Sequence, residues 1–147
     1  MTRAEVVSEA RNWVGVPYRK KGRTASGIDC LGLLVVVARV FNVPHVDHHD
    51  YSDWPDPMYR ILRELEKHLN PAPLTGPLPG TIGVFNQRIL PAHVGIFSTL
   101  NGVTHLIHAH LDEDRVLEQP WRARTPATRS GAPIRLLRVF VFPGLED

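Results

Sequence analysis

The chain has only one cysteine, Cys30, among its 147 residues, and this scarcity excludes a class of folds. A single cysteine can form no internal disulfide, so a small domain held together by disulfides is excluded. A chain of this length is close to the usual size of one domain and can bury enough apolar surface to fold without such bonds. We therefore expect a single domain, residues 1–147, compatible with a reducing compartment.

Long apolar runs are also missing. The longest, Leu31 to Ala38, is far shorter than the roughly 18 residues of a transmembrane helix. The N-terminal segment is charged and lacks the apolar centre of a secretory signal peptide. We expect a protein made in the cytoplasm, not inserted into a membrane, that another assembly must deliver if it acts outside the cell.

A strong excess of either charge is absent as well. The formal net charge is +2 and the pI is near 9.0. Nucleic-acid-binding proteins usually carry a dense basic stripe with interleaved aromatic residues, and the arginines near the C-terminus do not form one. We expect no nucleic-acid partner. A solvated face is the simpler interpretation of these arginines, and attraction to an anionic polymer such as a bacterial cell wall is the alternative.

Apolar spacing predicts helices in the first half of the chain and strands in the second. Helical periodicity covers residues 2–14, 29–41 and 58–69. Strand-like runs follow at residues 81–85, 93–99, 103–110, 115–120 and 134–142. Two stretches are expected to be loops: residues 15–27, which are rich in glycine and polar residues, and the proline-rich residues 70–80. This order predicts an α+β fold, with N-terminal helices packed on an antiparallel sheet.

Cys30 lies where a loop meets a predicted buried helix. Asp29 is a good N-cap residue, so Cys30 falls in the first helical turn, where free backbone N–H groups point outward. Such groups are expected to lower the thiol pKa and to help bind an oxyanion. Most lone cysteines, however, are buried and inert. Position alone therefore favours an inert core residue.

The strand histidines change this interpretation. Asn101-Gly102 predicts a tight hairpin turn, which places Ile96 opposite Ile107. Extending the same register, three histidines share one face of the sheet and a fourth points to the other face: His93, His108 and His110 against His105. A base and an orienting partner on neighbouring strands is the arrangement that a cysteine nucleophile requires.

Three motifs in this order, "GIDCLGL", "HVGIF" and "LIHA", resemble the NlpC/P60 family of papain-like cysteine peptidases. The segment "GVPY" is similar to the family's segment before the cysteine. The resemblance runs from about Ala4 to about Trp121, and "DCLGL" and "YSDW" look most like the phage cell-wall peptidase or tail-associated subgroup.

The resemblance implies the following roles. Cys30 would be the nucleophile, His93 the general base and His108 the residue that orients the imidazole, with His110 as the alternative for this third role. Tyr18 would help to position the nucleophile or the oxyanion, and we assign Asp29 to the same positioning group.

The cluster "HVDHHD", residues 45–50, is tested as a metal site. It lies in a proline-flanked loop and lacks the ligand spacing of known zinc sites, so a solvated loop beside the substrate groove is the better interpretation. We expect no metal and no other cofactor.

The sequence therefore predicts a thiol peptidase that hydrolyses peptidoglycan stem peptides, with the D-glutamyl–diamino acid bond implied by the resemblance. The expected setting is a phage or prophage tail tip that opens the cell wall, with other tail-tip proteins as partners. Two alternatives stay open. One is another acyl-transfer enzyme, such as a toxin amidase or a transglutaminase-like enzyme, and the other is a non-catalytic tail subunit that retains the fold.

Overall fold

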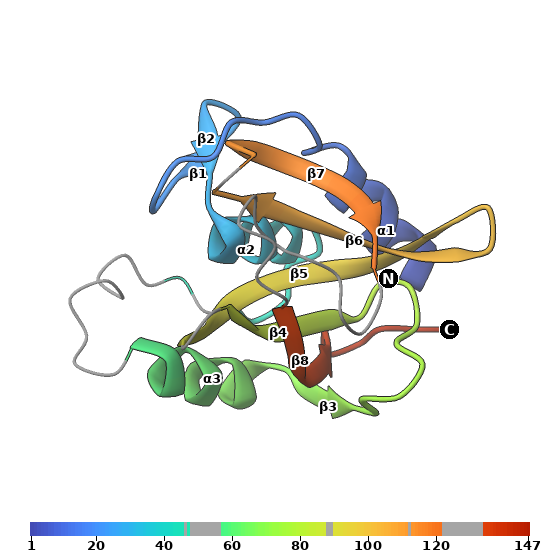
Figure 1. Ribbon diagram of the computed structural model, residues 1–147. Helices are drawn as coiled ribbons and strands as arrows, with labels where there is room; N and C mark the ends of the chain where they lie inside the picture. Colours follow the sequence, from blue (N-terminus) through green and yellow to red (C-terminus); the bar gives the residue numbers. More distant parts are fainter. Residues whose placement is uncertain (46, 48–56, 88–89, 112, 122–133) are drawn as a thin grey trace.

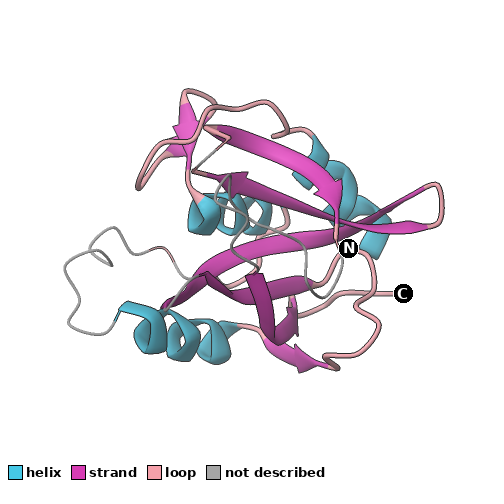
Figure 2. Cartoon of the chain, viewed as in Figure 1, coloured by secondary structure: helices cyan, strands magenta, loops and turns pink. Residues whose placement is uncertain are grey.

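The computed structural model of the chain describes residues 1–45, 47, 57–87, 90–111, 113–121 and 134–147. Figures 1 and 2 show helices packed around a twisted antiparallel sheet. The helices are α1 (Arg3–Arg11), α2 (Cys30–Val40) and α3 (Pro57–His68). The strands are β1 (Arg23–Thr24), β2 (Gly27–Ile28), β3 (Asn70–Ala72), β4 (Ile82–Gln87), β5 (Leu90–Leu100), β6 (Val103–His110), β7 (Arg115–Pro120) and β8 (Ile134–Val141). The predicted α+β class is confirmed.

The main sheet has six strands in the order β3-β8-β4-β5-β6-β7, and every neighbouring pair is antiparallel. β1 and β2 form a separate two-stranded hairpin directly before α2. The two chain ends lie side by side, because Thr2 and Glu146 form a parallel bridge. No helix in the described ranges is long and apolar enough to cross a membrane.

Each helix follows from its local sequence. Thr2 and Glu5 form a capping box at the start of α1, with both hydrogen bonds present. α2 is buried nearly all round, from Leu31 to Ala38, as its apolar sequence indicates. In α3 the predicted apolar stripe is buried at Ile61 and Leu65.

One face of the main sheet packs against these helices and forms the larger core. Val94 and Ile96 of β5 and Ile107 of β6 lie in this core, together with side chains of α1, α2 and α3. The opposite face carries a smaller aromatic cluster, centred on Phe85 and Phe97. Because side chains alternate along a strand, His93 of β5 and His108 and His110 of β6 lie on the same face as Phe97, and His105 lies on the other.

Two loop predictions are wrong. Residues 70–80 were expected to contain no strand because prolines disrupt ladders, yet β3 includes Pro71 and pairs with β8. β3 is an edge strand, where a proline loses no ladder bond that the sheet needs. Residues 15–27 were also expected to be a loop, but they contain β1 and most of the short β1–β2 hairpin. A hairpin of two-residue strands leaves too little alternation for a sequence pattern to reveal it.

The predicted register of the β5–β6 hairpin is confirmed: Leu100 pairs with Val103 and Ile96 with Ile107. The expected extension of this ladder is not found, since pairing between the described strands ends at Ile96–Ile107. β5 instead continues along β4, and β6 continues along β7 as far as His110. The two strands therefore spread apart from their hairpin, as Figure 1 shows, and the predicted site lies where they separate.

Candidate active site

Cys30 is the first residue of α2, with Asp29 as its N-cap, as predicted. Its half-buried side chain packs against the larger core. The backbone N–H groups of Val94 and Leu31 act on the sulfur as hydrogen-bond donors. Val94 directly follows His93 in β5, so the sulfur lies against the strand that carries the predicted base.

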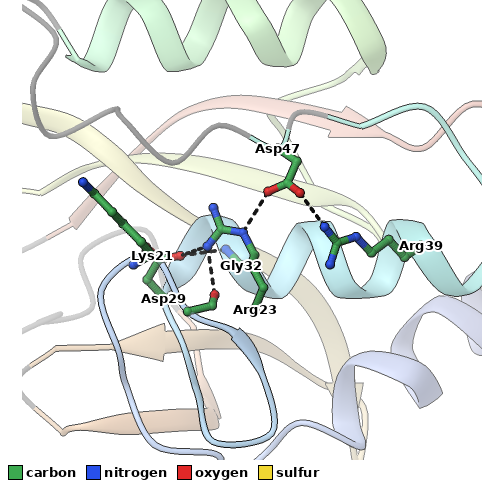
Figure 3. Close-up of polar contacts among 7 residues, drawn as sticks. Lys21, Arg23, Asp29, Gly32, Arg39 and Asp47 are labelled. Carbon is green, nitrogen blue, oxygen red and sulfur yellow. Dashed lines mark hydrogen bonds and ion pairs between the residues drawn. The ribbon is translucent and has the colours of Figure 1, made fainter.

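The buried carboxylate of Asp29 holds this helix start in place (Figure 3). One oxygen accepts from the backbone N–H of Gly32 at 2.8 Å and from the Arg23 guanidinium at 3.0 Å. The other oxygen accepts from the backbone N–H of Lys21 at 2.7 Å. These bonds give Asp29 a structural role; its expected part in positioning substrate stays a prediction.

Close backbone approach accompanies these bonds. A Cβ placed on Gly32 would come within 2.4 Å of the carbonyl oxygen of Gly22, which real Cβ atoms do not do. Only glycine therefore lets the loop before Cys30 lie directly on the first turn of α2.

Arg23 is the site residue that the sequence did not reveal. Its side chain is only 7% exposed and makes ion pairs with Asp29 and Asp47, each at 3.0 Å. Asp47 is also paired with Arg39 near the end of α2, as Figure 3 shows. No spacing rule connects these residues, because the contacts depend on how the loops fold back. Asp47 thus links the segment that follows α2 to Arg23, in the segment that precedes α2.

Asp47 comes from the "HVDHHD" cluster, of which the structure describes only His45 and Asp47. His48, His49 and Asp50 lie outside the described residues. Within the described ranges no group of three or more His, Cys, Asp or Glu side chains is arranged to hold a metal ion.

The expectation that the helix start lowers the Cys30 pKa is wrong. Burial of the thiol, together with the nearby Asp29 carboxylate, raises the pKa of Cys30 to about 12. The N–H groups of Val94 and Leu31 and the charge of Arg23 oppose this rise but do not overcome it. The position at the helix start is as predicted, but desolvation of the thiolate is the larger effect. Cys30 therefore rests as a neutral thiol.

The two predicted histidines meet as the sequence indicated. His93 Nε2 lies 2.6 Å from His108 Nδ1, within hydrogen-bond distance, and both rings are buried. The ring planes are inclined by 73° and their centroids are 4.8 Å apart. This contact involves Nε2 of His93, so Nδ1 is the ring nitrogen that lies outside it.

Burial also determines the charge of these rings. It lowers the pKa of His93 to about 3, with a smaller contribution in the same direction from the charge of His110. Burial likewise lowers the pKa of His108, and the charges of His93 and His110 add to this effect. The site therefore rests with a neutral thiol and two neutral imidazoles.

His110 and Tyr18 complete the predicted set. The His110 ring lies edge-on to His108, with centroids 5.2 Å apart, and 6.3 Å from His93. This arrangement puts His108 nearer to the predicted base than His110. Tyr18 is half-buried, and burial followed by the charges of Cys30 and Asp29 raises its pKa, so its hydroxyl stays protonated near the sulfur. His105, whose ring contacts the carbonyl oxygen of Val103, does not belong to this group.

Solved structures provide the comparison for this arrangement. The NlpC/P60 domain of the peptidoglycan hydrolase SagA aligns with 82% of this chain and 90% of its own, at 22% identity and a TM-score of 0.58. NlpC2 from Trichomonas vaginalis aligns with 95% of this chain at 17% identity and a TM-score of 0.67. The chain has the NlpC/P60 fold.

A further similar structure is an N-acetylmuramoyl-L-alanine amidase from Bacteroides uniformis, with 12% identity, 95% of this chain and 98% of that chain covered, and a TM-score of 0.61. Several NlpC/P60 proteins are much longer, since this chain spans 47% of NlpC2 and 42% of NlpC1 from Trichomonas vaginalis. No protein-family model matches the sequence, and no curated protein is significantly similar to it.

The neutral histidines of this NlpC/P60-fold site make a prediction about acid stability. Below pH 6.5, the ordinary pKa of histidine, His93 and His108 bind protons in the unfolded chain but stay neutral in the folded chain. The free energy of unfolding should therefore be highest above this pH. It should fall as the pH drops toward about 3, the folded-state pKa of His93. Each histidine adds a slope of at most about 1.4 kcal/mol per pH unit.

Urea unfolding between pH 7 and pH 5 measures this slope. The double variant His93→Gln/His108→Gln should lose less stability than the wild type over that interval. His105→Gln, which removes a histidine and leaves the buried pair intact, serves as the control and should keep the steeper dependence. Equal slopes for wild type and double variant would contradict neutral buried rings.

Proposed function

We propose that this protein is a cysteine hydrolase that cleaves amide bonds in peptidoglycan. The observation that carries the proposal is the 2.6 Å contact between His93 and His108, made beside a cysteine at a helix start. The proposed nucleophile is on α2, the proposed base on β5 and the proposed orienting group on β6. Similar structures with this fold include a peptidoglycan hydrolase and an N-acetylmuramoyl-L-alanine amidase, which supports a cell-wall substrate.

The neutral resting pair defines the first step. The Cys30 sulfur attacks the carbonyl carbon while its proton passes to Nδ1 of His93, so general-base catalysis accompanies the attack. The positive end of the α2 dipole, with the protonated hydroxyl of Tyr18, stabilises the negative oxygen of the tetrahedral intermediate.

The remaining steps return the enzyme to its starting state. His93 gives its proton to the leaving amine as the carbon–nitrogen bond breaks, which leaves a thioester on Cys30. Water then attacks this thioester, with His93 accepting a water proton and returning it to the sulfur. The products are a free amine and a carboxylic acid. His108 holds the His93 ring in position throughout and carries no charge in the resting site.

Removal of the nucleophile is the direct test. Cys30→Ala should abolish the release of new amines from purified peptidoglycan, because no other described group is placed to form the thioester. Mass spectrometry of the digest measures this and identifies the bond, which we propose to be the D-glutamyl–diamino acid bond. Unchanged far-ultraviolet circular dichroism would show that the variant folds. Equal digestion by both proteins would refute the nucleophile assignment.

The choice of orienting residue can be tested separately. His108→Ala should reduce turnover more than His110→Ala, because His108 makes the hydrogen bond to His93 and His110 lies farther from that ring. A loss of about 10²-fold or more is expected for His108→Ala, in the range typical of general acid–base groups. Steady-state rates of the two variants on the same peptide decide this. The reverse ranking would transfer the third role to His110.

We further propose that the protein acts from a phage or prophage tail tip. This rests on the likeness of "DCLGL" and "YSDW" to tail-associated relatives. Peptide mass fingerprinting of purified virions from an induced lysogen should detect the chain, and antibody labelling should place it at the tail tip. Its absence from tail tips would remove this part of the proposal and leave the hydrolase assignment intact.

A further inference from the structure

We propose that Gln119 is a positioning residue of this site: its side-chain oxygen accepts the Nε2 proton of His108 and thereby fixes the tautomers of both histidines. This deepens the proposed hydrolase function and rests on it for the roles of Cys30 and His93. The residue lies on β7, two strands away from His93.

The first observation is a buried nitrogen without a partner. His108 is fully buried, and one of its nitrogens, Nδ1, meets His93. The other nitrogen, Nε2, makes no hydrogen bond of normal geometry with any residue that the structure describes. A buried polar atom left in this way destabilises the folded protein, so a neighbouring side chain that can accept its proton is favoured.

The sheet register brings Gln119 to this nitrogen. On β6 and β7, His108 is opposite Leu117, and Leu106 is opposite Gln119. Opposite residues share a face of the sheet, so Gln119 is the diagonal neighbour of His108 on the same face. Such neighbours are about 7–8 Å apart at the backbone, within reach of a side chain as long as glutamine.

The chemistry of the contact agrees with an acceptor. The nearby Gln119 side chain raises the pKa of His108, although burial and the neighbouring charges lower it by more. A group that raises the pKa of an imidazole stabilises its protonated form, as a carbonyl oxygen does and an N–H donor does not. The register and this effect together assign the amide oxygen of Gln119 as the acceptor for the ring.

The consequence for catalysis follows from counting protons. His93 can act as a base at Nδ1 only if its own proton is on Nε2. Since Nε2 of His93 meets Nδ1 of His108, that second nitrogen must be the acceptor, and the proton of His108 must be on Nε2. An acceptor at Gln119 favours this arrangement, while no acceptor leaves the opposite one equally available. The ring tautomers thus form one directed chain from the sulfur to β7.

The wild-type protein gives the first test. Nitrogen-15 NMR of the folded protein at pH 7.5 reports which ring nitrogen of each histidine carries the proton. The proposal requires the proton of His108 on Nε2. A proton on Nδ1 of His108 would overturn it, and this reading depends on no variant and no substrate.

The second test compares two substitutions of similar length. Gln119→Met removes the acceptor, whereas Gln119→Glu keeps one. Gln119→Met should mix the His108 tautomers and lower kcat about tenfold at unchanged KM, the effect of losing one neutral hydrogen bond. Gln119→Glu should keep the Nε2 tautomer and retain most of kcat. Leu117→Met, on the same strand and face, is the control for packing and should match the wild type.

The rate of Cys30 alkylation by iodoacetamide, measured against pH, separates this proposal from the proposed function. Gln119→Met should slow alkylation at pH 7 and change the pH profile, even if no peptidoglycan cleavage is found in any variant. If the wild type cleaves no peptidoglycan but the variants show this alkylation pattern, only the proposed substrate is refuted. A wild-type profile and wild-type tautomers in Gln119→Met, or equal losses in Gln119→Met and Gln119→Glu, would refute the role of Gln119.

Discussion

The rest of the site depends on the contacts made by the buried carboxylate of Asp29. It caps α2, accepts a hydrogen bond from the backbone N–H of Lys21 and forms a buried ion pair with Arg23. Removing one partner of a buried pair typically costs about 3–5 kcal/mol, because the other charge is left in a dry environment. The same contacts place the Cys30 sulfur against β5. Stability of the loop and placement of the candidate nucleophile are therefore one property of this protein.

Desolvation of the buried side chains is the second constraint, and it determines their protonation states. Burial raises the pKa of Cys30 and lowers those of His93 and His108, so the resting groups are uncharged. In a site of uncharged imidazoles, proton transfer depends on which ring nitrogen carries the proton. The hydrogen-bond partners of each ring determine this tautomer. This gives weight to a residue such as Gln119, which bears no charge.

Local rules were sufficient wherever one segment determines its own structure. The capping box at Thr2 and Glu5, the N-cap at Asp29 and the buried helix after Cys30 all depend on neighbours within a few residues. The turn at Asn101-Gly102 set the register, and alternation along the strands then brought His93 and His108 to one face. The same rules failed at Pro71, because whether a strand lies at a sheet edge depends on the whole sheet.

The sequence by itself determined the α+β class, the position of Cys30 at a helix start and the pairing of His93 with His108. These follow from periodicity, capping and turn chemistry, which act over short distances along the chain. Only the tertiary structure decided the protonation of the site, the clamp of Arg23 with Asp29 and Asp47, and the place of Gln119. Burial and long-range contacts are properties of the packed chain, so no local pattern could reveal them.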